Sequence, residues 1–256
     1  MDTKREIVGY DIIVIQSLKE CDCETGKILF HDIIQYKPCY RNDIHVEFYD
    51  VSTLNEFQEL FSKLEQEIPS DHILTLHFET HGCDDGIGLS SGEIVCWKDF
   101  FSLIRPLNIK TSNLLTVVMS MCKGAAISSY LEPTKRCPYR VFIGFEHNMD
   151  EKVLLEAFST FYETYNNMLD ITVSWERMNN VLPKEEKAWL IRAQDIFESV
   201  LNPDTNLDSF NSVVDNYYNG FDNQGQPLSR EQYKEQVRQC FINLANENRS
   251  YYNFKE

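Results

Sequence analysis

The sequence has no excess of basic residues. Its 24 Lys and Arg stand against 40 Asp and Glu, which gives a formal net charge of −16. Proteins that bind nucleic acid or an anionic membrane neutralise phosphates with Lys and Arg, so we expect neither as a main partner. An acidic surface favours basic partners or basic substrate segments, and it is equally consistent with solubility alone.

Long apolar runs are also missing. The longest, such as 12–15 and 114–119, are far shorter than the roughly 20 residues that a transmembrane helix needs. The first six residues are polar, and the apolar segment of a secretory signal does not follow them. We therefore expect a cytoplasmic protein.

The eight cysteines are not spaced like zinc ligands. Cys21, Cys23 and Cys39 come closest, but no second pair of Cys or His at zinc-like spacing accompanies them. Thiols stay reduced in the cytoplasm, so an even number of cysteines does not indicate disulfides there. We expect no metal and no other cofactor, and a structural or exposed role for Cys21 and Cys23.

Apolar segments of strand length alternate with segments of helical periodicity. Strands are predicted at 10–18, 28–36, 44–51, 73–80, 114–121 and 140–145. Helices are predicted at 52–68, 97–107, 125–131 and 150–169. This alternation is typical of an α/β three-layer sandwich, a mostly parallel sheet with helices on both faces. The first three strands are predicted to form a strand followed by a hairpin-like pair.

The pattern changes after Pro183. Three charged segments, 185–201, 207–218 and 229–246, have helical character and are separated by polar linkers that contain Pro or Gly. We therefore expect two parts, a sheet domain over residues 1–182 and a helical C-terminal extension over residues 183–256.

Two predicted strands end in a reactive side chain close to a glycine. The segment ILTLHFETHG ends in His81 and Gly82, and the segment NLLTVVMSMCKG carries Cys122 two residues before Gly124. Ligands bind at the carboxyl ends of strands in an open parallel sheet, and sequential strands usually lie side by side. We therefore expect His81 and Cys122 to meet at one edge as a general base and its nucleophile.

The surroundings of both residues suit this chemistry. The helix predicted just after Cys122 would favour the thiolate through its free amides and dipole, as would the imidazole. Gly82 allows a turn that exposes its N–H, which with the N–H of Cys122 would form an oxyanion hole. His77 and Glu79 share the strand parity of His81 and are candidates for orienting it, although a strand histidine bonded to a backbone carbonyl is more common.

This combination resembles the caspase-like cysteine peptidases. Caspases carry Q-A-C-[RQG]-G, with the histidine about 50 residues upstream. Here the segment is SMCKG and Gln-Ala is absent, which argues against a true caspase. The sequence is more similar to CHAT-type domains, in which His-Gly is followed by an acidic, glycine-rich loop and a helix that begins with Trp. The matching segments here are 84–89 and Trp97, followed by a strand end at 143–144 and a Phe-Tyr helix at 158–162.

The resemblance spans residues 70–180 and implies a caspase-like cysteine endopeptidase that needs no cofactor. By this resemblance Cys122 is the nucleophile, His81 is the general base and acid, and the amides of Gly82 and Cys122 are the oxyanion donors. It further implies a protein or peptide substrate. Resembling proteases are commonly activated by a partner protein or a signal, and bacterial ones often belong to defence or cell-death systems.

Acidic residues near the predicted strand ends are candidates for substrate binding. They are Asp84, Asp85, Glu146 and Asp150. One of them could pair with a Lys or Arg at P1, so we expect cleavage after a basic residue, although solvated loop acids explain the same pattern. Two other interpretations stay open: a catalytically silent caspase-fold subunit that binds a partner, and a different cysteine-dependent hydrolase with the same dyad.

Overall fold

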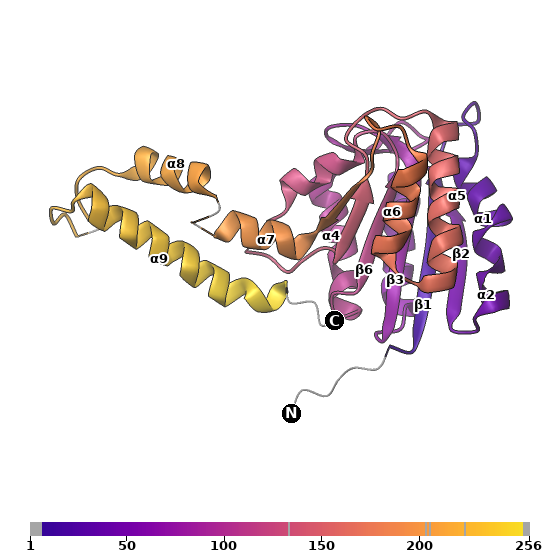
Figure 1. Cartoon of the computed structure of the whole chain (residues 1–256), viewed down its shortest axis with the longest axis horizontal. Coiled ribbons are helices and arrows are strands. Elements are labelled where there is room, and N and C mark those ends of the chain that lie inside the picture. Colours follow the sequence, from indigo (N-terminus) through magenta and orange to yellow (C-terminus); the bar gives the residue numbers. More distant parts are fainter. Residues whose placement is uncertain (1–6, 133, 203, 205, 223, 253–256) are drawn as a thin grey trace.

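The computed structural model describes residues 7–252 apart from residues 133, 203, 205 and 223. A sheet forms the centre of the larger part of the molecule, and a helical arm projects from one side (Figure 1). The main strands, in spatial order, are β2 (Ile44–Asp50), β1 (Gly9–Ser17), β3 (His72–Gly82), β6 (Leu115–Ser120), β7 (Val141–Gly144) and β8 (Trp189–Arg192). Neighbouring strands are parallel except for β7 and β8. Two short strands, β4 (Gly86–Gly88) and β5 (Ile94–Cys96), extend from the end of β3.

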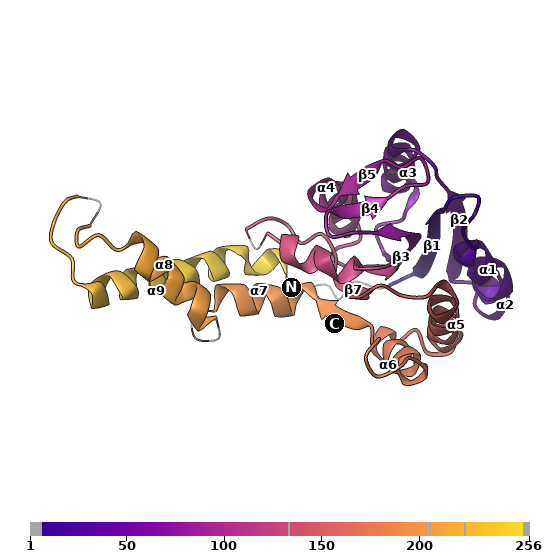
Figure 2. The same ribbon diagram turned by 90° about the horizontal axis from the view of Figure 1, so that it is seen from above.

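Helices cover both faces of this sheet (Figure 2). One face packs against α1 (Thr25–Asp32), α5 (Glu151–Met168) and α6 (Ile171–Val181). The opposite face packs against α3 (Leu54–Glu67) and α4 (Trp97–Lys110). Side chains alternate along a strand, so each central strand contributes to two apolar cores, one under each helical layer. The predicted α/β three-layer fold with a mostly parallel sheet is confirmed.

The alternation in β3 separates its polar residues from its apolar ones. Phe78 is fully buried in the core beneath α3 and α4. His77, Glu79 and His81 occupy the alternate positions and therefore face the α1 and α5 side. The ring of His77 confirms this orientation, because it packs edge-on against Phe158 of α5 with ring centroids 5.0 Å apart. The catalytic candidate on β3 thus lies under the α1 and α5 layer.

The predicted strand at 28–36 is wrong, because this segment is helical. It contains most of α1, a 3₁₀ turn (Ile34–Tyr36) and the approach to α2 (Lys37–Tyr40). Its buried residues, Leu29 and Ile34, lie on the side that meets the sheet, whereas Lys27 and Asp32 are exposed. Periodicity alone does not separate a short apolar strand from a short helix. As a result β1 and β2 are parallel and joined by helices, and the predicted hairpin-like pair does not form.

The segment after Pro183 is not wholly helical either. Residues 189–192 form β8, which pairs antiparallel with β7 and completes the sheet, so the helix predicted over 185–201 is wrong in its first half. A strand of four residues is too short to produce a clear alternating pattern. The arm itself consists of α7 (Ala193–Leu201), α8 (Leu207–Tyr217) and α9 (Arg230–Asn248).

The arm is attached to the sheet domain at two places. The first is β8, from which helix α7 follows directly. The second lies beyond α9, where the ring of Tyr252 stacks on the ring of Phe197 of α7 at a centroid distance of 4.4 Å. The Tyr252 hydroxyl donates a hydrogen bond to the carbonyl of Glu132 (3.0 Å). Further out, α8 and α9 pack together through a small cluster of their own, Phe210, Val214 and Val237.

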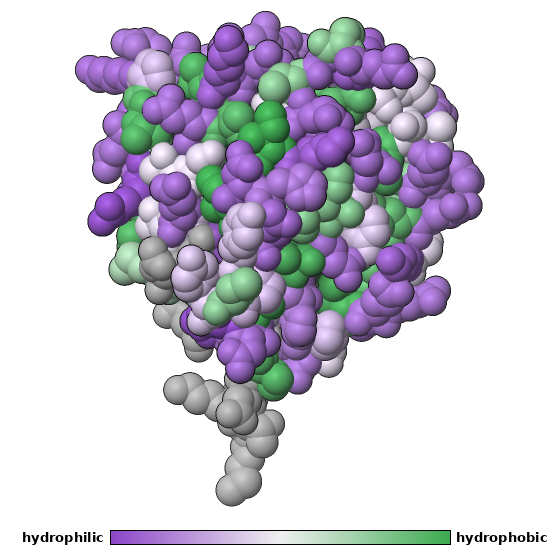
Figure 3. Space-filling model, turned by 90° about the vertical axis from the view of Figure 1, so that its right-hand side faces the viewer, coloured by the Kyte–Doolittle hydropathy of each residue, from purple (hydrophilic) through white to green (hydrophobic). Residues whose placement is uncertain are grey.

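The surface at the α1 and α2 end of the molecule is largely hydrophilic, and its hydrophobic residues form small scattered groups (Figure 3). In the part of the chain that the structure describes, no helix combines the length and the apolar character that crossing a bilayer requires.

We expect Tyr252→Ala to lower the free energy of unfolding by about 3 kcal/mol, because it removes a buried aromatic ring and a hydrogen bond. Urea denaturation of the full-length protein measures this change. Tyr217→Ala is the matched control, since Tyr217 on α8 is 70% exposed and its loss should cost less than about 0.5 kcal/mol. Equal effects of the two substitutions would show that the C-terminal anchor contributes nothing.

Candidate active site

The register of the sheet brings His81 and Cys122 to the same level. Leu74 pairs with Leu115 and Glu79 with Ser120, so every register pair of β3 and β6 is 41 positions apart. His81 and Cys122 are also 41 positions apart, and each lies two residues beyond the last register pair, Glu79 and Ser120. The two strands therefore deliver both residues to one point of the carboxyl edge. Adjacency of these strands, which the sequence predicts, is confirmed.

Gly82 contacts the backbone of Cys122 directly. A Cβ atom at position 82 would lie 1.9 Å from the carbonyl oxygen of Cys122, which is far inside any allowed contact. Only glycine lets the two chain segments approach this closely. The residue type at position 82 is therefore required by the packing of the two strand ends.

A cavity of about 370 Å³ opens at this edge, and both His81 and Cys122 line it. Its walls come from the carboxyl ends of β3 and β6, from residues 18–24 between β1 and α1, and from the N-terminus of α5. Four of its lining residues are acidic, namely Asp22, Glu79, Asp150 and Glu151, and none of the lining residues in the described chain is Lys or Arg. The cavity is thus suited to a cationic group.

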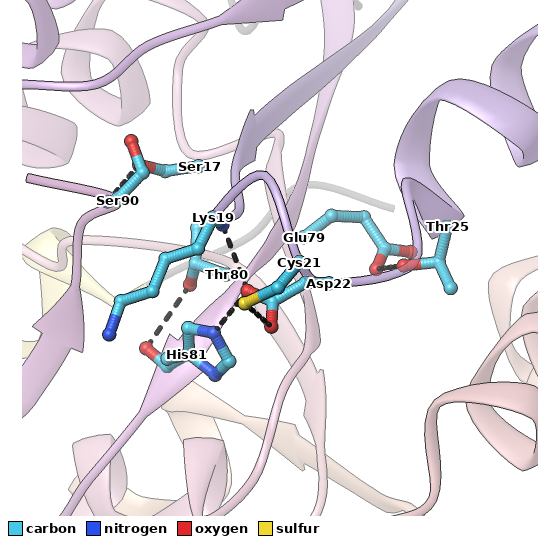
Figure 4. Close-up of polar contacts among 9 residues, drawn as sticks. All are labelled: Ser17, Lys19, Cys21, Asp22, Thr25, Glu79, Thr80, His81 and Ser90. Carbon is cyan, nitrogen blue, oxygen red and sulfur yellow. Dashed lines mark hydrogen bonds and ion pairs between the residues drawn. The ribbon is translucent and has the colours of Figure 1, made fainter.

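The imidazole of His81 contacts a carboxylate that the sequence analysis does not select. Its Nε2 lies 2.7 Å from Oδ2 of Asp22, and the ring points toward that carboxylate (Figure 4). The hydrogen bond with His81 is the main cause that lowers the pKa of Asp22. One sequence signal does exist: Asp22 follows β1, which neighbours β3, and the loops after neighbouring parallel strands open on the same edge.

Cys122 has an environment that differs from the predicted one. Residues 124–130 form a 3₁₀ helix and not an α-helix, and Lys123 before it has a left-handed conformation (φ 55°). The amides of Lys123 and Ala125 already donate to carbonyls of the 145–147 segment. The predicted stabilisation of a thiolate by a helix N-terminus is therefore wrong.

Two other groups interact with Cys122. The N–H of Met149 donates to its Sγ (3.4 Å). Lys123 supplies a positive charge: its pKa is raised, chiefly by the hydrogen bond of its ammonium to Asp84 (2.8 Å), and its charge also interacts with Cys83 and Cys122.

The backbone offers one clear oxyanion donor. Among the described residues no acceptor is found for the N–H of Cys122. The neighbouring Gly82 lies against Cys122, so the backbones of both predicted donors lie at the mouth of the same cavity.

His77 and Glu79 form a buried network beside the cavity. Nε2 of His77 lies 2.9 Å from Oε1 of Glu79, and the hydroxyl of Thr25 donates to Oε2 of Glu79 (2.7 Å). Both oxygens of this carboxylate are thus engaged. The group that contacts His81 is Asp22, and these two candidates for orienting the base contact each other instead.

The four acids predicted for substrate binding lie in different places. Asp150 lines the cavity, and its Oδ1 also accepts the N–H of Lys152 as the N-cap of α5 (2.9 Å). Asp84 and Glu146 line a separate hollow of about 290 Å³, where Asp84 is paired with Lys123. Asp85 is exposed, and its carbonyl accepts the N–H of Trp97 (3.2 Å). Only Asp150 shares the cavity with His81 and Cys122.

All eight cysteines are free thiols in the structure. Over the described residues, no group of three or more His, Cys, Asp or Glu side chains is placed to hold a metal ion. The arrangement at the sheet edge supports nucleophilic chemistry at sulfur with an imidazole as the proton carrier.

We expect Gly82→Ala to destabilise the protein by about 1–3 kcal/mol and to slow alkylation of Cys122, because the two strand ends must move apart. Gly88→Ala is the matched control. Gly88 of β4 pairs with His81 of β3, and a Cβ at position 88 would make an ordinary contact of 3.4 Å with the Cβ of His81. Urea denaturation and the rate of Cys122 labelling measure the two effects. A Gly82→Ala variant as stable and as reactive as Gly88→Ala would contradict the close packing.

Comparison with family models and with curated proteins found no match. The resemblance to caspase-like peptidases therefore depends on the residues at the two strand ends and on their surroundings.

Proposed function

We propose that the protein is a cysteine endopeptidase that acts through Cys122 and His81. The observation that carries this proposal is the shared register of β3 and β6, which brings both side chains into one cavity with Gly82 beside them. Cysteine peptidases need a thiol, a base within reach and backbone N–H donors for the developing oxyanion. Cys122 supplies a thiol, His81 lines the same cavity, and the backbones of Gly82 and Cys122 lie against each other there.

The proposed reaction is acyl transfer through a thioester. His81 takes the proton of the Cys122 thiol, and the sulfur attacks the carbonyl carbon of the substrate. The N–H groups of Cys122 and Gly82 bind the oxyanion of the tetrahedral intermediate, and His81 returns the proton to the leaving amine. A water molecule, deprotonated by the same imidazole, then hydrolyses the thioester and restores the thiol.

We also propose cleavage after a basic residue. The support comes from the cavity, where Asp150 and Glu151 at the start of α5 supply carboxylates and none of the described lining residues is Lys or Arg. A Lys or Arg side chain entering the cavity would gain these charges as partners. Of the acids predicted from sequence, Asp150 fits this role, whereas Asp84 is already paired with Lys123.

Activation by a partner protein stays a prediction. The helical arm is the part of the structure that is best placed to receive such a partner, because α8 and α9 extend away from the sheet (Figure 1) and carry exposed aromatic residues around their connection, Tyr217 and Phe221.

At neutral pH, limiting iodoacetamide should label Cys122 before the more exposed Cys21, Cys39 and Cys240. His81→Ala should slow labelling of Cys122 at least about tenfold, because the thiolate loses its imidazole partner. Peptide mass spectrometry of the labelled protein measures both rates, and Cys122→Ala is the negative control. Uniform labelling that His81→Ala leaves unchanged would favour the catalytically silent subunit.

A panel of peptides that differ only at P1 tests the substrate class. Arg and Lys at P1 should be cleaved and Asp at P1 should not. The double variant Asp150→Asn/Glu151→Gln, which keeps an N-cap residue on α5, should lower kcat/KM for Arg peptides about tenfold, the effect of losing roughly 1.4 kcal/mol of charge interaction. Glu146→Gln in the separate hollow is the control and should have no effect. Cleavage confined to Asp peptides would disprove basic specificity.

A further inference from the structure

One carboxylate at the cavity has no role in the proposed dyad chemistry, yet it contacts the base. Asp22 lies in the 18–24 loop and accepts from His81 at 2.7 Å. An ionised carboxylate only accepts hydrogen bonds, so the Nε2 atom that faces it must carry the proton. The Nδ1 atom of the neutral ring is then left with a free lone pair.

We propose that Asp22 is the positioning residue of His81, which makes the site a Cys122–His81–Asp22 triad. This inference rests on the proposed function, because it assigns the proton path within the same site. Asp22 holds His81 in the tautomer that has Nδ1 free, and Nδ1 receives the proton from the Cys122 thiol. The resulting imidazolium, protonated on both nitrogens, keeps its hydrogen bond to the Asp22 carboxylate, whose charge stabilises it.

The backbone holds Asp22 in place for this role. The N–H of Lys19 donates to Oδ2 of Asp22 (2.8 Å), and the thiol of Cys21 lies 3.8 Å from Oδ1 (Figure 4). These contacts close the 18–24 loop on itself directly after β1. Since β1 pairs with β3 along nine residues, the loop begins beside the strand that ends in His81. The carboxylate is thus oriented before any substrate binds.

The other acids of the cavity have different partners. Glu79 is bonded to Thr25 and His77, and Asp150 caps α5. Among the acids that line the cavity, Asp22 is the one with a hydrogen bond to His81. The titratable groups that line the cavity with His81 are Asp22 and Cys23 from the loop, Glu79 from β3, Cys122, and Asp150 and Glu151 from α5.

Asp22→Asn removes the charge and, through its amide N–H, can impose the opposite tautomer on His81. In serine peptidases with a buried triad the same change lowers kcat about 10⁴-fold. His81 is 53% exposed here, so water can replace part of the contact. We therefore expect kcat to fall about 10- to 100-fold with KM changed less than about twofold, since Asp22 acts through His81. The assay uses the full-length protein and an Arg-P1 peptide.

Glu20→Gln is the matched control. It removes one negative charge from the same exposed loop, away from the Asp22–His81 contact, and should leave kcat unchanged. Asp22→Glu, which keeps the carboxylate, should recover part of the activity lost in Asp22→Ala. A loss that is equal in Asp22→Ala, Asp22→Glu and Asp22→Asn, with an equal loss of thermal stability, would assign Asp22 a structural role and overturn the inference.

A readout that needs no substrate separates this inference from the proposed function. The rate of Cys122 alkylation is measured against pH in the wild type, in His81→Ala and in Asp22→Asn. The profile of Asp22→Asn should differ from that of the wild type, because the imidazole loses the carboxylate to which it is hydrogen-bonded. If His81→Ala leaves the profile unchanged, the dyad itself fails. If His81→Ala changes the profile and Asp22→Asn does not, only the role of Asp22 fails.

Nitrogen NMR of the histidine ring tests the tautomer directly. In the wild type the neutral His81 ring should carry its proton on Nε2, and in Asp22→Asn the Nδ1-protonated form should become a substantial fraction. A wild-type ring protonated on Nδ1 would overturn the inference, whatever the activity of the variants.

Discussion

The close approach of β3 and β6 at their carboxyl ends is the constraint on which the site depends. Parallel pairing fixes the register of the two strands over six consecutive rungs, and Gly82 lets the chain continue past the last rung without separating them. The register sets the level of His81 and Cys122, and the glycine lets the two strand ends approach closely. Any side chain at position 82 would have to displace the carbonyl of Cys122. The chemistry of the site is thus a consequence of strand pairing, which the buried cores on both sheet faces stabilise.

The groups around Cys122 at this edge of the sheet can be compared with the net charge of the whole protein. A chain with a net charge of −16 disfavours a further anion, and a thiolate at Cys122 is such an anion. Locally, the N–H of Met149 donates to the Cys122 sulfur, and the charge of Lys123, which is paired with Asp84, also interacts with Cys122. Asp150 and Glu151, which directly follow Met149, line the same cavity. Under the proposed function, these carboxylates are the groups that a cationic substrate side chain would meet in the cavity.

The sequence alone predicts that His81 and Cys122 end two neighbouring strands, because the patterns that indicate this are local. An apolar run that ends in His-Gly or Cys-x-Gly identifies a strand and its reactive end, and parallel topology then brings the ends together. The contact of Asp22 with His81 was not predicted, because its position after β1 becomes informative only once β1 is known to neighbour β3. With 28–36 predicted as a strand, the β1 connection is misassigned and the loop around Asp22 becomes a simple turn. The short β8 was missed, and the helix predicted at 125–131 proved to be a 3₁₀ helix, because four to seven residues give no periodicity that separates the alternatives.

The chain that follows Cys122 connects the site with the arm. It runs from Lys123 through the 3₁₀ helix to the segment around Glu132, where the Tyr252 hydroxyl is bonded, and Arg136, whose guanidinium lies 4.6 Å from the ring centroid of Tyr251. The last residues of the arm thus hold the far end of the segment that begins at the nucleophile. Because α7 leaves from β8 and β8 pairs with β7, the other end of the arm is attached to the strand beside β6. A partner that moved the arm would therefore act on both sides of Cys122, through the sheet and through the segment after it.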